Sequence, residues 1–398
     1  MVSPCLFLGL GIYMKLDIGR SVFIDHHAHS ILKRHLEVDV IGFRRAFSES
    51  GSLAMFEKHV PHSLHYMNMR ERLKDYLRFE TDDELIEARQ TLSAPDYVNE
   101  LWDDASLGGL LIDDGFNPET SMSVHELAKV CGRPVFKLVR LEPIFERLVC
   151  ERDSFQELIQ HLQLAMHSFS DSIPVGFKTI AAYRGGLPSE PTIDLAAAKE
   201  SFNEIKLQMV GNSKNEAKKF RISSSPLYHY LLLNAFQLAA HSKLPVQIHT
   251  GIGDGDLILH DANPTVMTPI VKDKRFASCN FVFLHCYPYH REAAYMCSVF
   301  PNCYMDLSLS VILVSAMAKN FVRETLAVAP ASKILAGTDG HTVPEMHWYG
   351  AMVMKEALQA VLNDLLDENY LQLPQAQLVA ENVLYRNCRE LYSLEGLL

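Results

Sequence analysis

The segment SVFIDHHAHS, residues 21–30, places an apolar run directly before an aspartate and three histidines. Its β-branched and aromatic side chains favour an extended strand. Residues two apart on a strand point to the same side, so His27 and His29 can both reach one metal ion. Two ordinary histidines at the rim of a sheet would produce the same pattern. Taken alone, the segment predicts a strand that ends in side chains capable of chemistry.

Similar β-branched or apolar runs recur along the chain, each followed by a longer stretch with helical periodicity. With the first run included, they occupy residues 21–27, 109–114, 134–141, 174–182, 245–250, 280–286, 302–308 and 333–339. Repeated strand–helix units of this kind indicate a parallel sheet. This series predicts an α/β fold of the (β/α)₈ TIM-barrel type, which needs roughly 250 residues. We expect one such domain over residues 1–398.

A helical insertion is predicted after the first strand, over residues 30–105. The interval is longer than one crossover helix requires, and Thr81 to Glu84 has the pattern of a capping box at a helix start. We expect these helices to form a cap near the mouth of the barrel.

Composition favours a small-molecule substrate. The chain has 37 Lys+Arg against 48 Asp+Glu, a formal charge of −11, which argues against nucleic acid or an anionic membrane as partner. The apolar stretch Cys5–Met14 is too short to span a bilayer, and we interpret it as a packing segment. The 8 cysteines contain no CxxC pair, so we expect reduced thiols in a cytoplasmic protein. Assembly into a homo-oligomer is left open.

Several predicted strands end in a side chain that can bind a metal. His249 ends the fifth, His285 the sixth and Asp339 the eighth, while Lys178 lies inside the fourth. Barrel enzymes carry their catalytic groups at the carboxyl ends of the strands, where side chains converge on the barrel axis. Imidazole and carboxylate together suit Zn²⁺, Fe or Mn²⁺. Each residue alone could be a core histidine or a turn aspartate, but their joint occurrence favours a metal site.

This order of residues resembles the amidohydrolase superfamily: HxH on the first strand, Lys on the fourth, His on the fifth and sixth, and Asp on the eighth. The surrounding sequence resembles its amidohydrolase-related (type 2) branch, in particular the amidohydrolase-like domain of nodulin/glutamine-synthetase fusion proteins. The segments that carry this likeness are GFKTIAAYRGGL (176–187), IHTGIGDGD (248–256), HCYPYHREAAY (285–295) and GTDGHTVPE (337–345).

The resemblance implies that His27, His29 and Asp339 bind a divalent metal, with Zn²⁺ the expected ion. It implies that His249 and His285 are further ligands or, in one case, a group that polarises a carbonyl. Lys178 would either be carboxylated and bridge two metals or pair with a carboxylate inside the barrel. The implied reaction is hydrolysis of an amide-type C–N bond by metal-activated water, with Asp339 carrying the proton to the leaving nitrogen.

Arginines near the strand ends predict a carboxylate-bearing substrate. A guanidinium at Arg140 or Arg184 can hold a carboxylate with two hydrogen bonds, although either could instead brace a neighbouring acid. Asp254, Tyr287 and Glu345 follow the predicted metal-ligand strands and are further candidates for substrate binding.

Two other functions are compatible with the sequence. The same barrel and ligand set supports non-oxidative decarboxylation or a uronate-isomerase-like reaction, because a fold does not determine chemistry. A non-catalytic metal-binding protein is the second alternative. The chain has no GxSxG, HExxH or P-loop motif, so the corresponding hydrolase and nucleotide-binding classes lack their local signatures.

Overall fold

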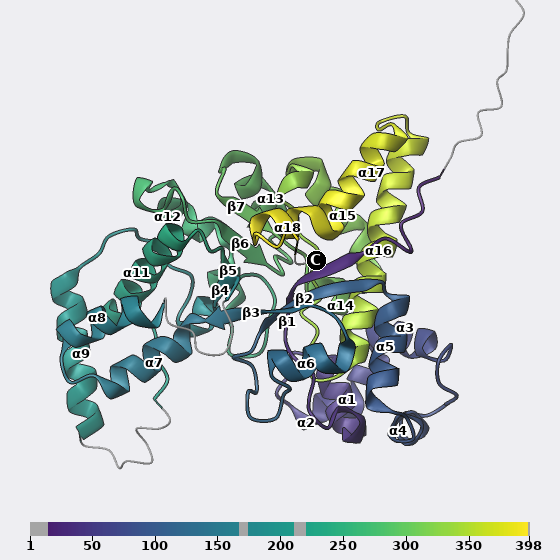
Figure 1. Cartoon of the computed structure of the whole chain (residues 1–398), viewed down its shortest axis with the longest axis horizontal. Coiled ribbons are helices and arrows are strands. Elements are labelled where there is room, and N and C mark those ends of the chain that lie inside the picture. Colours follow the sequence, from purple (N-terminus) through teal and green to yellow (C-terminus); the bar gives the residue numbers. More distant parts are fainter. Residues whose placement is uncertain (1–14, 167–173, 211–219, 397–398) are drawn as a thin grey trace, which may run out of the picture.

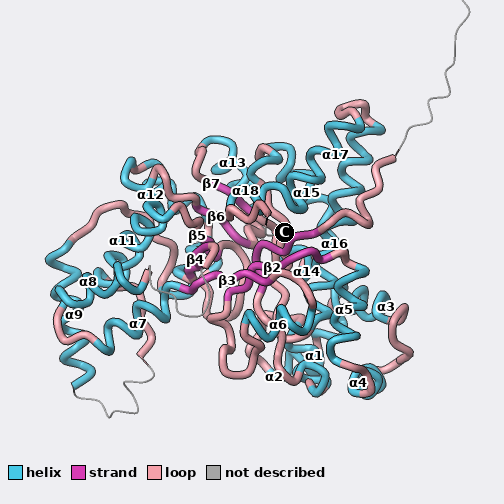
Figure 2. The backbone as a smooth tube through the Cα atoms, in the orientation of Figure 1, coloured by secondary structure: helices cyan, strands magenta, loops and turns pink. Residues whose placement is uncertain are grey.

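The computed structural model describes residues 15–166, 174–210 and 220–396. The predicted packing segment Cys5–Met14 lies outside these residues. Within the described parts, seven parallel strands form one sheet in which each strand pairs with the next along the chain. Figures 1 and 2 show the curled sheet at the centre of the molecule with helices around it. The strands are β1 (Phe23–Ala28), β2 (Leu107–Asp113), β3 (Val135–Arg140), β4 (Gly176–Thr179), β5 (Val246–His249), β6 (Phe281–Leu284) and β7 (Cys303–Met305).

The eighth predicted strand, residues 333–339, is not a regular strand in the structure. The segment nevertheless lies between the two edge strands: Leu335 N donates to Met305 O of β7 at 2.9 Å, and His26 N of β1 donates to Ala336 O at 3.1 Å. Asp339 has a φ of +57°, which interrupts a β ladder at that point. The predicted α/β TIM-barrel-like fold is therefore confirmed in outline, with an irregular eighth element.

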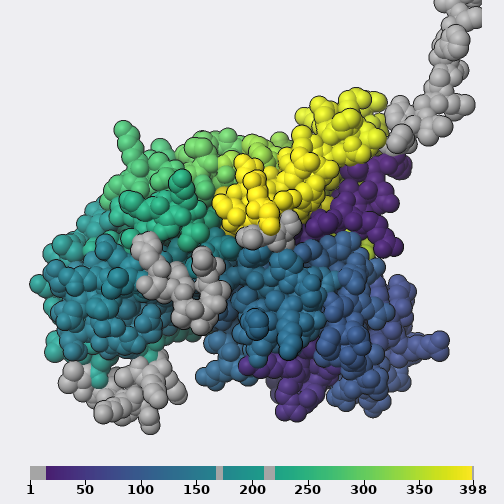
Figure 3. All heavy atoms as spheres, in the orientation of Figure 1, coloured from purple at the N-terminus to yellow at the C-terminus, as the bar shows by residue number. Residues whose placement is uncertain are grey.

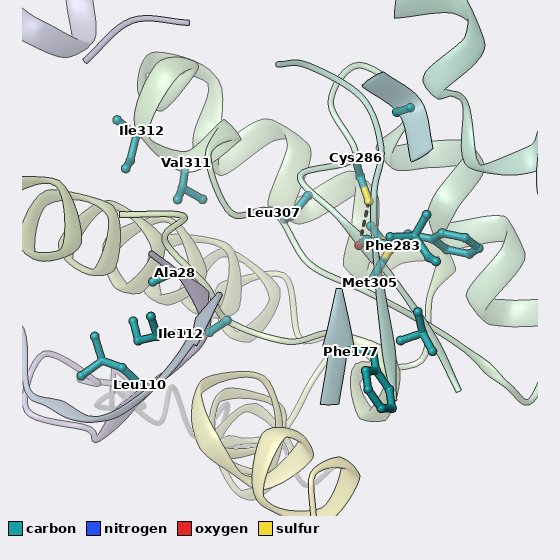
Figure 4. Packing of buried hydrophobic residues seen from close by; sticks show 14 of the residues in the cluster. Ala28, Leu110, Ile112, Phe177, Phe283, Cys286, Met305, Leu307, Val311 and Ile312 are labelled. Carbon is teal, nitrogen blue, oxygen red and sulfur yellow. Dashed lines mark hydrogen bonds between the residues drawn. The ribbon is translucent and has the colours of Figure 1, made fainter. Parts of the chain in front are cut away.

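Alternate residues of the strands pack on opposite sides of the sheet. Leu111 of β2 and Val282 of β6 share one buried cluster, although their strands are not neighbours, so this cluster lies inside the curled sheet. Leu391 and Tyr392, from the end of α18 (Asn387–Leu391) and the residue after it, join the same cluster and close that end of the interior. The outer side of the sheet belongs to a larger cluster, part of which is drawn in Figure 4.

Helices occupy much of the interval between β1 and β2. The capping box is confirmed: Glu84 N donates to Thr81 Oγ1 at 3.2 Å, and Thr81 N donates to Glu84 Oε2 at 3.3 Å. That these helices act as a cap remains a prediction. They are α1 (Val40–Ala46), α2 (Leu53–Lys58), α3 (Leu64–Leu73), α4 (Asp82–Gln90) and α5 (Ala94–Asp104).

The remaining helices surround the sheet (Figure 1). Those after β2, β3 and β4 are α6 (Val124–Cys131), α7 (Leu141–Glu151), α8 (Phe155–Ala165), α9 (Leu195–Val210) and α11 (Pro226–Ser242). Those after β5 are α12 (Thr268–Lys272), α13 (His290–Val299), α14 (Ser310–Leu313), α15 (Ala318–Val328), α16 (Pro344–Asp367) and α17 (Leu373–Glu381). No helix in the described ranges has both the length and the apolar composition needed to cross a bilayer.

The first described residues pack on a helix from the other end of the chain. Leu16 N donates to Asn363 Oδ1 and Ile18 N donates to Gln359 Oε1, each at 2.8 Å, so the segment runs along α16. Figure 3 shows these purple residues beside the yellow C-terminal helices. The two ends of the described chain thus belong to one packed unit.

A buried ion pair joins the helical interval to α16. Arg89 Nε of α4 donates to Glu345 Oε1 at 2.5 Å, and Tyr97 OH of α5 donates to the same oxygen at 2.8 Å. Arg89 and Glu345 are both 0% exposed. The side chains of Arg89 and Glu345 therefore have a structural role, which is to hold α4 against α16.

We expect Arg89→Met to lower the free energy of unfolding by about 3–5 kcal/mol, because it leaves the Glu345 carboxylate buried without its counter-charge. Chemical denaturation followed by circular dichroism measures this. The matched control is Arg34→Met, which breaks the exposed pair with Glu37 and should leave stability unchanged. Equal stability of both variants would show that the buried pair is not required.

Candidate metal centre

The candidate ligands meet at the carboxyl ends of the strands. His249 ends β5, and in the parallel register Lys178 of β4 pairs with Gln247 of β5, two residues before His249. Because residues two apart share a face of a strand, Lys178, Gln247 and His249 all project to the same side of the sheet. His285 directly follows β6, and Asp339 lies in the segment that joins β7 to β1.

Three of these side chains place their ligand atoms close together. His27 Nε2 lies 3.0 Å from Asp339 Oδ1, and His29 Nε2 lies 3.3 Å from the same oxygen. One ligand atom from each residue falls within 4.8 Å of the others, and all three residues are buried. Asp339 Oδ1 accepts no hydrogen bond among the described residues. A buried carboxylate oxygen that faces two imidazole nitrogens fits a bound cation.

Hydrogen bonds on the far side of each ring orient these imidazoles. His27 Nδ1 lies 2.7 Å from Gln247 Oε1, and the Gln247 amide nitrogen donates to His26 O and Tyr392 OH, each at 2.8 Å. The amide is thereby held with its oxygen toward His27, so Nδ1 carries the proton and Nε2 has a free lone pair. His29 Nδ1 is held in the same way by Asp113 O at 2.9 Å.

His249 and His285 complete a group of four imidazoles. Their ring centroids lie 4.4 Å apart, and those of His27 and His285 lie 5.4 Å apart. Burial lowers the pKa of His249 and of His285 well below 6.5, so both rings are neutral at physiological pH. Neutral imidazoles can bind a metal or accept a hydrogen bond.

The backbone at His285 is held in an unusual conformation. Its φ is +66°, which is costly for a residue other than glycine. Asp306 Oδ1 accepts from His285 N at 2.6 Å, and Ser310 Oγ donates to His285 O at 2.8 Å. Asp306 Oδ2 also contacts His26 Nε2 at 2.7 Å. Asp306 thus connects β1, β6 and β7 and positions His285, a role that sequence reasoning did not assign.

Lys178 lies next to the metal-binding atoms. Its side chain is inside the barrel with 2% exposure, and Nζ is 3.2 Å from His27 Nε2. Within the described chain, no carboxylate oxygen lies within ion-pair distance of Nζ, which leaves the predicted alternative of a paired lysine without support. Burial lowers the pKa of Lys178 to about 8. About a tenth of this amine is therefore neutral at pH 7.

The predicted substrate-binding residues are not all free to bind a ligand. Arg140 Nε and Nη2 both donate to Asp113 Oδ2, at 3.0 and 2.7 Å. The ring of Tyr287 stacks on His290 with 5.9 Å between centroids. Glu345 is held by Arg89 and Tyr97, as described above. The structure does not bring Tyr287 or Glu345 to the histidine cluster.

Asp254 and two residues that sequence reasoning missed lie at the mouth. Tyr183 OH is 3.0 Å from His249 Nε2, and Asp254 N lies 3.4 Å from the same hydroxyl. Burial, with the charges of Asp339 and Asp254, raises the pKa of Glu49 to about 8. Glu49 follows α1, so the helical interval contributes a carboxyl group to the surroundings of the site. Neither residue ends a strand, so no sequence signal marked them.

A family model described as Amidohydrolase matches residues 217–394 of the chain. A protein from Lactobacillus casei, assigned as a metal-dependent hydrolase, has a similar structure over 96% of this chain and 99% of its own, with 29% identity and a TM-score of 0.82. The family match and the similarity over nearly the whole chain support a member of the amidohydrolase superfamily. The same two findings support an enzyme of the metal-dependent hydrolase type. The cluster of His27, His29 and Asp339 fits a divalent metal.

Two further similarities are limited to the fold or to part of the chain. A uronate isomerase from Thermotoga maritima shares the fold over 94% of both chains, with 13% identity and a TM-score of 0.65. Protein fluG of Emericella nidulans is 32% identical over 238 residues, which are 58% of this chain and 27% of that protein. The match therefore spans about a quarter of the length of this curated relative.

Proposed function

We propose that this superfamily member hydrolyses an amide-type C–N bond in a small, carboxylate-bearing substrate. The observation that carries the proposal is the convergence of His27, His29 and Asp339 with two neutral histidines and a buried lysine at the carboxyl ends of the strands. Each of these side chains can bind a metal or assist attack at a carbonyl, and together they face the mouth of the barrel.

In this proposal His27, His29 and Asp339 hold one divalent metal, with Zn²⁺ the ion we favour. A second metal would be held by His249 and His285 together with Lys178, if that lysine is carboxylated. A metal bound there lowers the pKa of water to near 7 and polarises a carbonyl group. Gln247 and Asp113 O fix the ring orientations, so that His27 and His29 present unprotonated Nε2 atoms.

Asp339 is suited to move the proton. Its Oδ1 lies 3.0 Å from His27 Nε2 and 3.3 Å from His29 Nε2 and accepts no hydrogen bond from the described residues, so this oxygen is open to a cation or a proton. Its ionised carboxylate can accept a proton from the attacking water and deliver it to the leaving nitrogen. Burial raises the pKa of Tyr183, so its hydroxyl stays protonated and can donate a hydrogen bond to the substrate at the mouth.

The test uses protein purified without chelator and supplied with Zn²⁺ and bicarbonate. Amides of glutamate at the γ-carboxyl, N-acyl amino acids and cyclic amides are assayed for release of the amine. We expect turnover of at least one class, complete loss after metal removal by dipicolinate, and recovery when Zn²⁺ is restored. Absence of hydrolysis at full metal occupancy would contradict the proposal.

Isomerisation is the second candidate, since solved uronate isomerases share this fold over nearly the whole chain. Glucuronate is incubated with the same preparation, and the keto sugar acid is detected by chromatography. Turnover of glucuronate without amide hydrolysis would favour the isomerase. Release of CO₂ from aromatic carboxylates would favour the decarboxylase, and no turnover of any substrate would favour a non-catalytic metal-binding protein.

A further inference from the structure

A pocket of about 300 Å³ lies between the turn after β4 and the segment that leads into α11. Tyr183 forms part of its wall, and the hydroxyl of the same residue contacts His249 in the metal centre. The side chain of Tyr183 therefore contacts both the pocket and the histidine cluster. It is lined by Tyr183, Arg184, Gly185, Arg221, Ile222, Ser223 and Ser224.

Arg184 is a buried guanidinium whose hydrogen-bonding capacity is largely unused. Its side chain is 9% exposed, and Nη2 makes a long contact of 3.4 Å with Glu146 Oε1. That oxygen also accepts from Ile222 N at 3.1 Å, so Arg184 shares it. Nε and Nη1 have no acceptor among the described residues. Because buried donors without partners are unfavourable, an oxyanion with several acceptor atoms would stabilise this side chain.

Arg221 brings a second guanidinium to the same pocket. Its side chain is 58% exposed. The carboxylate of Asp256, also exposed, lies 3.8 Å from Arg221 Nη1. Burial and the charge of Arg221 lower the pKa of Arg184, so the two guanidinium groups are close enough to repel each other. Such repulsion is relieved when an anion lies between them.

The turn at Gly185 allows the two walls to approach. Gly185 has a φ of +105°, and a Cβ there would lie 2.3 Å from Ser224 Cβ. Only glycine permits this contact, which brings Arg184 next to the segment that holds Arg221 and the serine hydroxyls. Arg140 offers no comparable opportunity, because its Nε and Nη2 are already donated to Asp113.

We propose that the Arg184–Arg221 pocket binds an oxyanion, a carboxylate or a phosphate, at the end of the substrate remote from the bond that is cleaved. The proposal rests on the proposed function for the position of that bond. Tyr183 then marks the boundary between the part of the substrate that is recognised and the part that reacts. The two serine hydroxyls supply neutral donors beside the two guanidinium groups.

Binding is tested with two probes, glutarate and inorganic phosphate, titrated into the metal-loaded protein by isothermal calorimetry. We expect one of them to bind and its affinity to fall about tenfold or more in both Arg184→Gln and Arg221→Gln, as loss of a charge-assisted hydrogen bond requires. Glutarate binding would identify a carboxylate pocket and phosphate binding a phosphate pocket. The exposed Arg386→Gln, which removes a surface pair with Glu381, should bind like the unmodified protein.

The proposal is overturned if neither probe binds, or if both variants bind the probes as tightly as the unmodified protein. Arg221 is exposed, so its variant should fold normally even if Arg184→Gln does not. Kinetics separate this proposal from the proposed function. If the unmodified protein hydrolyses no amide but binds an anion that the two arginine variants do not bind, the pocket is kept and the hydrolase is rejected. Amide hydrolysis with an unchanged KM for anionic substrates in Arg221→Gln would keep the hydrolase and reject the pocket.

Discussion

Asp339→Asn is expected to remove both metal binding and turnover. Asparagine preserves the size of the side chain, but it loses the charge that faces His27 and His29 and cannot accept a proton. A neutral amide oxygen is also a weaker ligand for a divalent cation than a carboxylate. We expect kcat/KM to fall by about 10⁴-fold or more, because a metal ligand and a proton carrier are lost together.

Elemental analysis measures the metal content per chain of the same samples whose kcat/KM is determined. The matched control is Asp256→Asn, an exposed aspartate of the loop after β5, which should keep both metal and most activity. Thermal melting of the two variants checks that each is folded. If Asp339→Asn retained full metal and turnover, Asp339 would be neither a ligand nor the proton carrier.

Lys178→Gln is expected to reduce the metal content from two ions per chain to one. A carbamate forms only on a neutral amine, and burial lowers the pKa of Lys178 to about 8, so the neutral form is accessible. Its Nζ also lies 3.2 Å from His27 Nε2, next to the residues that would hold the metal. We expect kcat/KM to fall by about 100-fold or more, at the upper end of what the loss of a group that supports a metal ligand costs.

The carbamate itself can be observed. Protein loaded with Zn²⁺ and ¹³C-bicarbonate should show a carbamate carbon signal that is absent from Lys178→Gln. Lys355 is the control, because burial also lowers its pKa to about 8 but its Nζ donates to Ala105 O at 3.1 Å, away from the histidines. Lys355→Gln should keep the signal and both metals. One metal per chain in all three proteins would indicate a mononuclear centre and raise isomerisation and decarboxylation above hydrolysis.

Local sequence determined much of the fold. Runs of β-branched and apolar residues correspond to all seven strands, because strand formation inside a barrel depends mainly on side chains that are buried on both faces. The capping box at Thr81 was readable because both of its partners lie within one helical turn. The eighth strand was predicted too regularly, since the positive φ at Asp339 follows from hydrogen bonds with β1 that the segment itself does not reveal.

In the candidate site, too, some residues could be predicted from local sequence and others could not. His27, His29, His249, His285 and Asp339 could be predicted because strand-end position is a local property, and the barrel then brings strand ends together. Partners across the barrel could not be predicted: Gln247 orients His27 from another strand, and Asp306 supports His285 while also bonding to His26. Arg140 and Arg184 looked equivalent in sequence, but their ion-pair partners differ, and those partners also come from other parts of the chain.

Arg140 lies beside Asp113 of the neighbouring strand and is paired with it. Among the residues that the structure describes, Arg184 has one ion-pair partner, the shared carboxylate of Glu146, and it lies near Arg221, far along the chain. The sequence by itself determined which residue types stand at the carboxyl ends of the strands, and hence the kind of chemistry to expect. Only the tertiary structure decided which of these charges are already neutralised by a neighbour and which remain available to a metal or a substrate, because pairing depends on residues distant in sequence.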